Sequence, residues 1–267
     1  MQFDVRGQTV YAYTGGQTFD ASKPCVVFLH GALNDHSVWT LLARWFAHHG
    51  HSVLALDQPG HCRSAGPLLP NVEALADWTW AMLDALGVQQ ASLVGHSMGS
   101  LIALAAAGQA PQRATALVMV GTAYPMVVSD ALLQAARDTP AQGMAMVNNL
   151  AISSTATKPG FPGPGSWLHG GGLQLMARVQ ASNKDANVFE HDFKVCGAYA
   201  GGLEAAAAVT CPAHLVLGDV DQMTPPKATK ALAAALRARV HRVPGGHSQM
   251  QEQPEATLAA IRAALGA

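Results

Sequence analysis

Short apolar runs recur along the chain, and several are followed closely by small or acidic residues. Short apolar runs of about four or five residues that are bounded by glycine and proline are typical of strands buried on both faces of a sheet. An alternating segment at 3–14, which turns at Gly7-Gln8, predicts a β-hairpin before them. The predicted buried strands are 26–30, 53–57, 92–95, 117–121, 214–218 and 240–243.

Helical patterns lie between these runs. The predicted helices are 38–48, 72–86, 98–110, 226–238 and 254–265. Asn71 is a suitable N-cap for the second, and the last two begin with proline, which fits a first helical turn. Strands that alternate with helices predict an α/β fold, in which a mostly parallel, doubly wound sheet has helices on both faces.

The alternation stops between residues 123 and 208. The predicted helices in this stretch are 131–137, 143–152, 173–180 and 193–208. We therefore expect a core made of 1–122 and 209–267 and an inserted helical cap, or lid, at 123–208. Its segment 159–165 is rich in proline and glycine, which interrupt regular structure, and fits a hinge or a static surface loop equally well.

Charge is scarce in this chain. Only 12% of the residues are charged, against roughly 25% in an average domain, and the net charge is −1. Such a surface offers no electrostatic footprint for nucleic acid or for an anionic membrane. The longest uncharged stretch, 85–112, exceeds the roughly 20 residues of a membrane span. Polar residues interrupt it, so a central strand followed by a buried helix is the better interpretation.

The N-terminal residues lack the profile of a secretory signal. The cysteines are scattered without the spacing of a disulfide framework or a zinc site; they are Cys25, Cys62, Cys196 and Cys211. These features favour a soluble, cytoplasmic protein that binds a small molecule, with neither nucleic acid nor a membrane as partner. They carry no information on the oligomeric state.

The main chemical signal is Gly95-His96-Ser97-Met98-Gly99, which follows a predicted strand and precedes a predicted helix. A serine on a sharp strand-to-helix turn has its hydroxyl pushed clear of the backbone, and the two glycines relieve the crowding there. The start of the helix behind it favours developing negative charge. We therefore expect Ser97 to be a nucleophile, the alternative being an ordinary turn.

A serine hydroxyl needs a base, usually a histidine that a carboxylate orients. His247 fits best, because it follows the last predicted strand in a glycine-rich turn. The carboxylate is expected after the strand 214–218, where Asp221 is preferred to Asp219 because it lies deeper in the loop. The neighbouring histidines His48, His49 and His51 resemble solvated side chains at a helix end more than a metal cluster.

Acyl transfer also requires donors for the tetrahedral oxyanion. The backbone N–H of Met98 is one candidate. The second is expected from the loop after the strand 26–30, where Gly31 lets the backbone come close. The N–H of Ala32 is preferred there, with that of Leu33 as the alternative.

These pieces together resemble the α/β-hydrolase fold superfamily over nearly the whole chain. The matching segments are His30-Gly31-Ala32, Asp57-Gln58-Pro59-Gly60-His61-Cys62-Arg63-Ser64, Gly95 to Gly99, Gly218 to Pro225, and Gly246-His247 followed by Glu252-Gln253-Pro254. The resemblance implies a triad of Ser97, Asp221 and His247 beneath a helical cap, with no cofactor and no metal. In this superfamily the segment that begins at Asp57 is a structural turn, so no catalytic role is expected for that residue.

The resemblance also separates branches of the superfamily. Epoxide hydrolases and haloalkane dehalogenases are expected to have aspartate in place of Ser97. Perhydrolase-like members typically continue the turn with further glycine, whereas Ser100 and Leu101 follow it here. Carbon–carbon bond hydrolases use the same triad, but their substrates carry carboxylates that call for arginine near the pocket. Arg137 and Arg178, in the predicted cap, keep that alternative open.

The predicted cap is rich in methionine, leucine and aromatic residues, which are Met126, Met144, Met146, Leu150, Ile152, Phe161, Trp167 and Met176. Such side chains are ordinary helix packing or, over a cleft, a surface for an apolar group. The expected function is hydrolysis of small to medium, mostly apolar carboxylic esters through an acyl-enzyme on Ser97. The alternatives are a carbon–carbon bond hydrolase, a lactonase, an acyltransferase, or a non-catalytic ligand receptor on this fold.

Overall fold

The computed structural model describes residues 1–153 and 167–267. Among these residues, eight strands form one sheet in the order β1-β2-β4-β3-β5-β6-β7-β8. The strands are β1 (Gln2–Val5), β2 (Gln8–Tyr13), β3 (Cys25–Leu29), β4 (Ser52–Leu56), β5 (Ala91–His96), β6 (Ala114–Val120), β7 (Ala213–Gly218) and β8 (Arg239–Val243). The β1–β2 hairpin joins β4 antiparallel, and all pairs from β4 to β8 are parallel. The predicted hairpin and parallel α/β sheet are confirmed.

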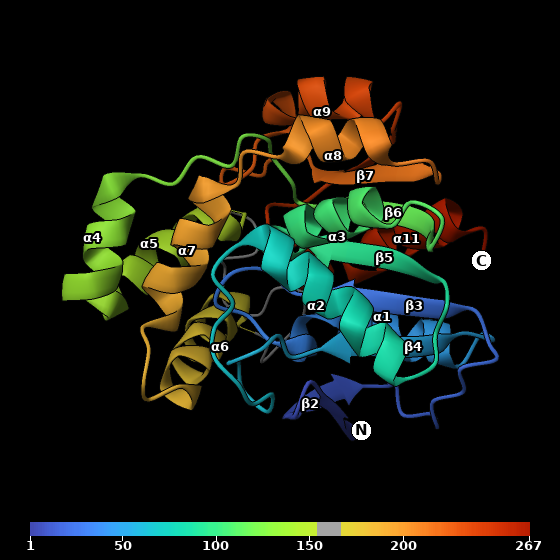
Figure 1. Cartoon of the computed structure of the whole chain (residues 1–267). Helices are drawn as coiled ribbons and strands as arrows, with labels where there is room; N and C mark the ends of the chain where they lie inside the picture. The colour runs from blue at the N-terminus through green and yellow to red at the C-terminus, as the bar shows by residue number, and fades with distance from the viewer. Residues whose placement is uncertain (154–166) are drawn as a thin grey trace.

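Helices cover both faces of the sheet (Figure 1). They include α1 (Thr40–Ala47), α2 (Val72–Ala85), α3 (Met98–Gln109), α9 (Lys230–Ala235) and α11 (Pro254–Leu265), with the short turns η1 (His36–Trp39), η2 (Pro226–Thr229) and α10 (Gln249–Glu252). Two apolar cores result because successive strand residues point to opposite faces. In β3, for example, Val27 packs in the core under α2 and α3, whereas Phe28 packs in the core under α1 and α11.

The stretch between β6 and β7 is helical in the residues that are described. It contains α4 (Asp130–Asp138), α5 (Pro140–Ala151), α6 (Leu168–Ser182), α7 (Val188–Ala198) and α8 (Gly202–Ala208). Figure 1 shows α4 to α7 grouped beside the sheet, whereas α8 lies with α3 over its face. The segment 159–165 and Phe161 lie outside the described residues. We call α4 to α7 the inserted helices; the division into a core and a cap at 123–208 remains a prediction.

One predicted helix is interrupted by non-helical residues in the structure. Residues 193–208 were expected to form a single helix, but the structure ends α7 at Ala198 and begins α8 at Gly202. Two consecutive glycines, which are poor helix formers, lie at the break. A Cβ at Gly202 would also collide with the ring of Tyr124, so glycine is required where α8 begins. Among the described helices, none has both the length and the apolarity needed to cross a bilayer.

Candidate active site

Ser97 lies in the turn between β5 and α3, with φ of 52° and ψ of −119°. A positive φ is strained for a residue with a side chain, and here it holds the hydroxyl clear of the backbone. Neither glycine of the motif could carry a Cβ. At Gly95 it would collide with the carbonyl of Gly99, and at Gly99 with the carbonyl of Leu29. Close packing of β5, α3 and β3 therefore requires both glycines.

Asp221 and His247 extend from the loops after β7 and β8 and meet in the structure. Nδ1 of His247 lies 2.9 Å from Oδ2 of Asp221, and both side chains are almost fully buried. The hydroxyl of Thr224 donates to Oδ2 of Asp221 at 2.7 Å and lies 3.0 Å from Nδ1 of His247. The amides of Met223 and Thr224 donate to Oδ1 of Asp221 at 2.9 and 2.8 Å. The second ring nitrogen of His247, Nε2, has no hydrogen-bond partner among the described residues.

These contacts determine the charge state of the carboxyl. Burial by itself raises the pKa of Asp221, but His247 and the donors of Thr224 outweigh that effect, and the pKa lies below its ordinary value. His96 packs against the ring of His247 and stays neutral, because burial lowers the pKa of His96 to about 3. Its Nε2–H donates to the carbonyl of His247 at 3.0 Å, a protonation assigned from the acceptor. An ionised Asp221 can therefore hold the neutral imidazole of His247 with its proton on Nδ1.

Ser97 and His247 line the same cavity, which measures about 50 Å³. Side chains of the inserted helices complete its wall, among them Val147 of α5, Met176 of α6 and Phe193 of α7. The described hydrogen bonds do not include one between Ser97 Oγ and His247, and such bonds are often long in unliganded sites. A second hollow, of about 240 Å³, also reaches Ser97, and its wall includes Met126, Leu132 and Phe193.

The backbone amides of Ala32 and Met98, both beside Ser97, have no acceptor among the described residues. Met98 is the first residue of α3, where N–H groups lack a partner within the helix. Ala32 lines both cavities. The amide of Leu33, the alternative donor, is occupied, because it donates to Oδ2 of Asp192 at 2.8 Å. A Cβ on Gly31 would lie 3.0 Å from the Cβ of Ser97, so glycine permits this close approach.

The alternative acid, Asp219, lies elsewhere. It is exposed and pairs with Arg242 at 2.6 Å. The two arginines of the inserted helices are also engaged away from the cavities: Arg178 pairs with Asp35 at 2.5 Å, and Arg137 lies 3.4 Å from Glu190. Neither arginine lines the cavity or the hollow that reaches Ser97.

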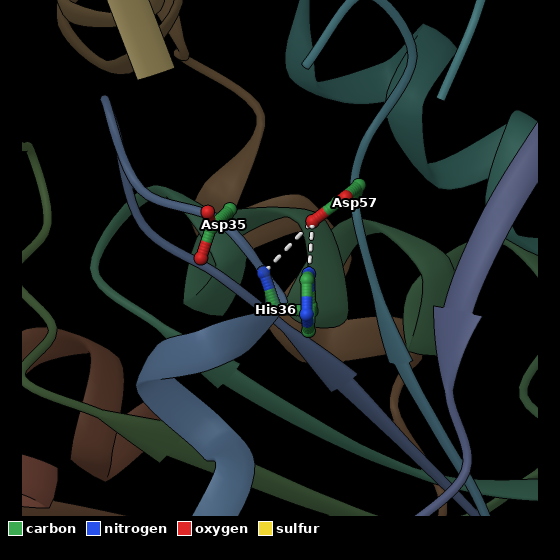
Figure 2. Close-up of side chains that lie close together, drawn as sticks. All are labelled: Asp35, His36 and Asp57. Atoms are coloured by element: carbon green, nitrogen blue, oxygen red, sulfur yellow. Dashed lines mark hydrogen bonds and ion pairs between the residues drawn. The ribbon is translucent and has the colours of Figure 1, made fainter. Parts of the chain in front are cut away.

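Among the described residues, one group of three potential metal ligands lies close together: Asp35, His36 and Asp57. Figure 2 shows Asp57 Oδ1 facing both the backbone nitrogen and the ring of His36, at 2.9 and 2.7 Å. The carboxylate of Asp35 accepts instead from Ser37 and Arg178. The oxygens are thus occupied by donors, which makes this a hydrogen-bonded turn. Asp57 Oδ2 also accepts the amide of Arg63, so its carboxylate ties together the loop after β4.

The histidines around residue 50 make separate contacts. His49 stacks on Trp45 and its Nδ1 lies 2.6 Å from the carbonyl of that residue. His48 contacts Gln17, and His51 lies 3.1 Å from the carbonyl of His49. These contacts at the end of α1 agree with solvated histidines at a helix terminus.

The apolar residues noted in the inserted stretch divide into two groups. Met126, Met144, Ile152 and Met176 are buried, whereas Met146, Leu150 and Trp167 are exposed. Met176 lines the 50 Å³ cavity, and Met126 and Leu150 line the 240 Å³ hollow. Part of the apolar set therefore packs between helices, and part reaches the space beside Ser97.

Sequence reasoning missed three residues near the site. Thr224 touches both Asp221 and His247, and its position three residues after Asp221 was the available signal. His61 and Asp192 form a buried pair with Nε2 and Oδ2 3.0 Å apart. They lie 131 residues apart in sequence, and no local pattern connects them.

Comparison with known proteins identifies the fold family. A profile of the family described as alpha/beta hydrolase fold matches residues 24–254. The dihydrolipoyllysine-residue acetyltransferase component of the acetoin cleaving system of Pseudomonas putida is 37% identical over 99 residues, which are 37% of this chain and 26% of that protein. Matches to several curated relatives span only 26% to 39% of those proteins' length.

Similar solved structures cover the chain more fully. An enol-lactonase from Burkholderia xenovorans LB400 has a TM-score of 0.82 at 20% identity, with 100% of both chains covered. An esterase from Exiguobacterium antarcticum has a TM-score of 0.82 at 15% identity, covering 100% of this chain and 99% of that one. At such identities the likeness concerns the fold alone. Because the family profile spans most of the sequence, the chain belongs to the α/β-hydrolase fold family.

Proposed function

We propose that this protein is a serine hydrolase that cleaves small to medium, mostly apolar carboxylic esters through an acyl-enzyme on Ser97. The observation that carries the proposal is the arrangement around His247. Its Nδ1 is held by an ionised, buried Asp221, while its ring borders the same cavity as Ser97. A serine on a strained turn beside an oriented imidazole is the arrangement that nucleophilic acyl transfer requires.

The first half of the reaction forms the acyl-enzyme. Oγ of Ser97 attacks the carbonyl carbon while its proton passes to Nε2 of His247. The amides of Ala32 and Met98 stabilise the oxyanion. When the intermediate collapses, the carbon–oxygen bond to the alcohol breaks, and the alcohol oxygen takes the proton from Nε2. The acid part of the substrate is then esterified to Ser97.

Water completes the cycle. His247 takes a proton from water as the water oxygen attacks the acyl carbon, and the same amides stabilise the second oxyanion. Collapse releases the carboxylic acid and returns the proton to Oγ of Ser97. Asp221 stays ionised throughout and stabilises the imidazolium that forms twice in each cycle. Every step uses groups of this chain and water.

The two spaces beside Ser97 suggest how an ester lies in the site. The leaving alcohol must reach Nε2 of His247, and His247 borders only the 50 Å³ cavity. Because one water needs about 10–15 Å³ by this measure, that cavity has room for a short alcohol. The larger hollow then takes the acyl group, and its Met126, Val128 and Leu132 favour an apolar chain.

The same geometry bears on the alternatives. A carbon–carbon bond hydrolase would need a cation for its carboxylated substrate, but Arg137 and Arg178 are paired elsewhere. A lactonase or an acyltransferase would share the machinery of Ser97, so substrates must separate them. A receptor on this fold would bind its ligand without turnover.

A fluorophosphonate probe tests the nucleophile. The parent protein is expected to be labelled at one residue, and Ser97→Ala is expected to lose the label while keeping its melting temperature. Equal labelling of Ser97→Ala would overturn the assignment. Ser100→Ala is a matched control, because Ser100 lies three residues away in the first turn of α3 but its hydroxyl is bonded to the carbonyl of Ser97 and to Thr122.

A panel of chromogenic esters tests the substrate class. Activity is expected to rise with acyl length at constant alcohol and to fall as the alcohol lengthens. The same panel should include a lactone and an added thiol or alcohol acceptor. Preference for the lactone, or acyl transfer to the acceptor in place of water, would replace ester hydrolysis by one of the alternatives.

A further inference from the structure

An acidic side chain points inward from the inserted helix α7. Asp192 is 2% exposed and lies among the apolar residues Phe189, Phe193 and Val195 of the same helix. Burying a carboxylate is costly unless donors compensate it. Its compensating donors come from the core of the fold, not from the neighbouring inserted helices. Oδ2 accepts the amide of Leu33 at 2.8 Å and Nε2 of His61 at 3.0 Å.

The first donor belongs to the loop that carries the free amide of Ala32. Leu33 has φ of 55° and is fully buried. A leucine with positive φ is a backbone outlier that surrounding contacts must hold in place. The hydrogen bond from its amide to Asp192 is such a contact. Because Ala32 directly precedes Leu33, this bond also limits how the peptide of Ala32 can rotate.

The second donor, His61, lies in the loop after β4. Both ring nitrogens of His61 face acceptors, Nδ1 the carbonyl of Pro59 at 3.0 Å and Nε2 Asp192. Assigned from these two acceptors, both nitrogens carry protons and the ring is a cation. Burial alone would lower the pKa of His61, but the charge of Asp192 and these hydrogen bonds raise it. Asp57 also raises this pKa, and the His61 ring packs 5.1 Å from that of His30.

His30 connects His61 to the loop that carries Ala32. Its Nε2 accepts the amide of Gln58 at 3.1 Å, so its proton is on Nδ1 and is donated to the carbonyl of Gly31 at 2.9 Å. That carbonyl and the N–H of Ala32 belong to one planar trans peptide, in which they point in opposite directions. Burial and the charge of His61 lower the pKa of His30 to about 4, which keeps this neutral form.

We propose that Asp192 is a positioning residue for the oxyanion site, holding the Ala32 amide through Leu33 directly and through His61 and His30. The inserted helix α7 thereby supplies part of the oxyanion geometry as well as part of the cavity wall. This inference rests on the proposed function, in which the Ala32 amide stabilises the oxyanion. An amide that serves only the transition state affects kcat, whereas a wall residue affects substrate binding.

Asp192→Asn tests the role in turnover. The variant keeps the shape of the side chain but removes its charge, so kcat for the best ester is expected to fall about ten- to a hundredfold, with KM changed less than about threefold. The matched control is Glu190→Gln, since Glu190 lies on the same helix but pairs with Arg137 and Lys194 at the surface. The control is expected to match the parent. An unchanged kcat in Asp192→Asn, or an equal loss in both variants, would overturn the inference.

Binding of a trifluoromethyl ketone separates positioning from loss of structure. Such a ketone forms an oxyanion on Ser97, so Asp192→Asn is expected to weaken its affinity by about the factor lost in kcat. Folded fraction is checked by thermal unfolding of the same samples. A kcat that falls only in proportion to the folded fraction, with unchanged ketone affinity of the folded part, would contradict the positioning role.

Nuclear magnetic resonance of labelled histidine tests the connection without any turnover. In the parent, His61 is expected to carry both protons at neutral pH, and Asp192→Asn is expected to remove one and to shift the Leu33 amide. If the parent hydrolyses no ester, the proposed function fails, while these signals still decide the contact. An unchanged His61 and Leu33 in Asp192→Asn would refute the inference even in an active enzyme.

Discussion

Two histidine–aspartate pairs, Asp221–His247 and Asp192–His61, are almost fully buried in this molecule. Asp221 and His247 belong to loops of the sheet, and their closest atoms are 2.9 Å apart. Asp192 and His61 join α7 to the loop after β4, at 3.0 Å. By residue type, distance and burial the pairs are nearly equal. They differ in the second nitrogen of the imidazole, which in His247 has no partner among the described residues and in His61 faces the carbonyl of Pro59.

In the proposed function, that difference separates the imidazole that moves a proton from the one that has a structural role. An imidazole that moves a proton needs one nitrogen fixed and one open to the reacting group. A ring with both nitrogens bound to acceptors holds its protons and acts as a fixed cation. A short distance between aspartate and histidine is therefore a poor guide to function in this molecule. The surroundings of the imidazole nitrogen that does not face the carboxylate are a better guide.

Replacing the two histidines is expected to give the largest difference in kcat and stability between the two pairs. His247→Ala should lower kcat by roughly 10⁴-fold or more, because it removes the base that takes the Ser97 proton in the proposed reaction. Stability should change little, because Asp221 keeps three other donors, from Met223 and Thr224. His61→Gln should instead lower stability by about 3–5 kcal/mol, since it leaves Asp192 buried without its cation. Steady-state kinetics and urea unfolding of both variants measure this. Similar losses of kcat in the two variants would show that the pairs do not differ as proposed.

The carboxylates after β7 provide the next contrast. Asp221→Asn should lower kcat by up to about 10⁴-fold, because an amide can donate to Nδ1 and stabilise the wrong tautomer of His247. Asp219→Asn should change kcat less than about twofold, since it removes only an exposed pair with Arg242. Both are compared with the parent at the same pH. Equal effects would remove the basis for assigning Asp221.

Stability against pH distinguishes the Asp192–His61 pair from the rest of the protein. The raised pKa of His61 means that its contribution is complete below pH 6.5 and is lost as pH rises through the folded-state pKa. The lowered pKa of Asp192 means that its contribution is complete above pH 3.8 and is lost as pH falls through the folded-state pKa. The pair therefore stabilises the fold most between these two values.

Urea unfolding of the parent and of Asp192→Asn measures this window. The parent is expected to exceed Asp192→Asn in unfolding free energy by about 3–5 kcal/mol at about pH 5.5 and by less at about pH 9. Taking the difference between the two proteins cancels groups that titrate alike in both. A difference that is constant over this range would mean that His61 does not gain its stabilising charge from Asp192.

The two pairs also differ in whether the sequence alone predicts them. The sheet, the hairpin and the strand–turn–helix around Ser97 follow from local patterns, because apolar runs and paired glycines leave few other structures. Asp221 and His247 lie in such patterned loops. Asp192 does not: an acidic residue in an amphipathic helix is usually on the solvated face. Its inward direction depends on Leu33 and His61, which folding brings from 159 and 131 residues away.

The smallest effect is expected at Arg178, whose guanidinium binds Asp35 and is more than half exposed. Burial by itself raises the pKa of Asp35, but the hydrogen bonds from Ser37 and the charge of Arg178 lower it to about 2. Arg178→Met should cost at most about 1 kcal/mol of stability, because solvent screens the pair, and should change kcat on neutral esters less than about twofold.

Arg137→Met is the matched control for that change, since Arg137 also pairs at the surface of the inserted helices. The informative substrates are esters that carry a second carboxylate. If Arg178 recognised such a group, Arg178→Met would raise KM for them well above the change seen with Arg137→Met. We expect the two variants to behave alike, because both guanidiniums lie outside the cavity and the hollow that reach Ser97. A selective rise would instead favour carboxylated substrates and return the carbon–carbon hydrolase to consideration.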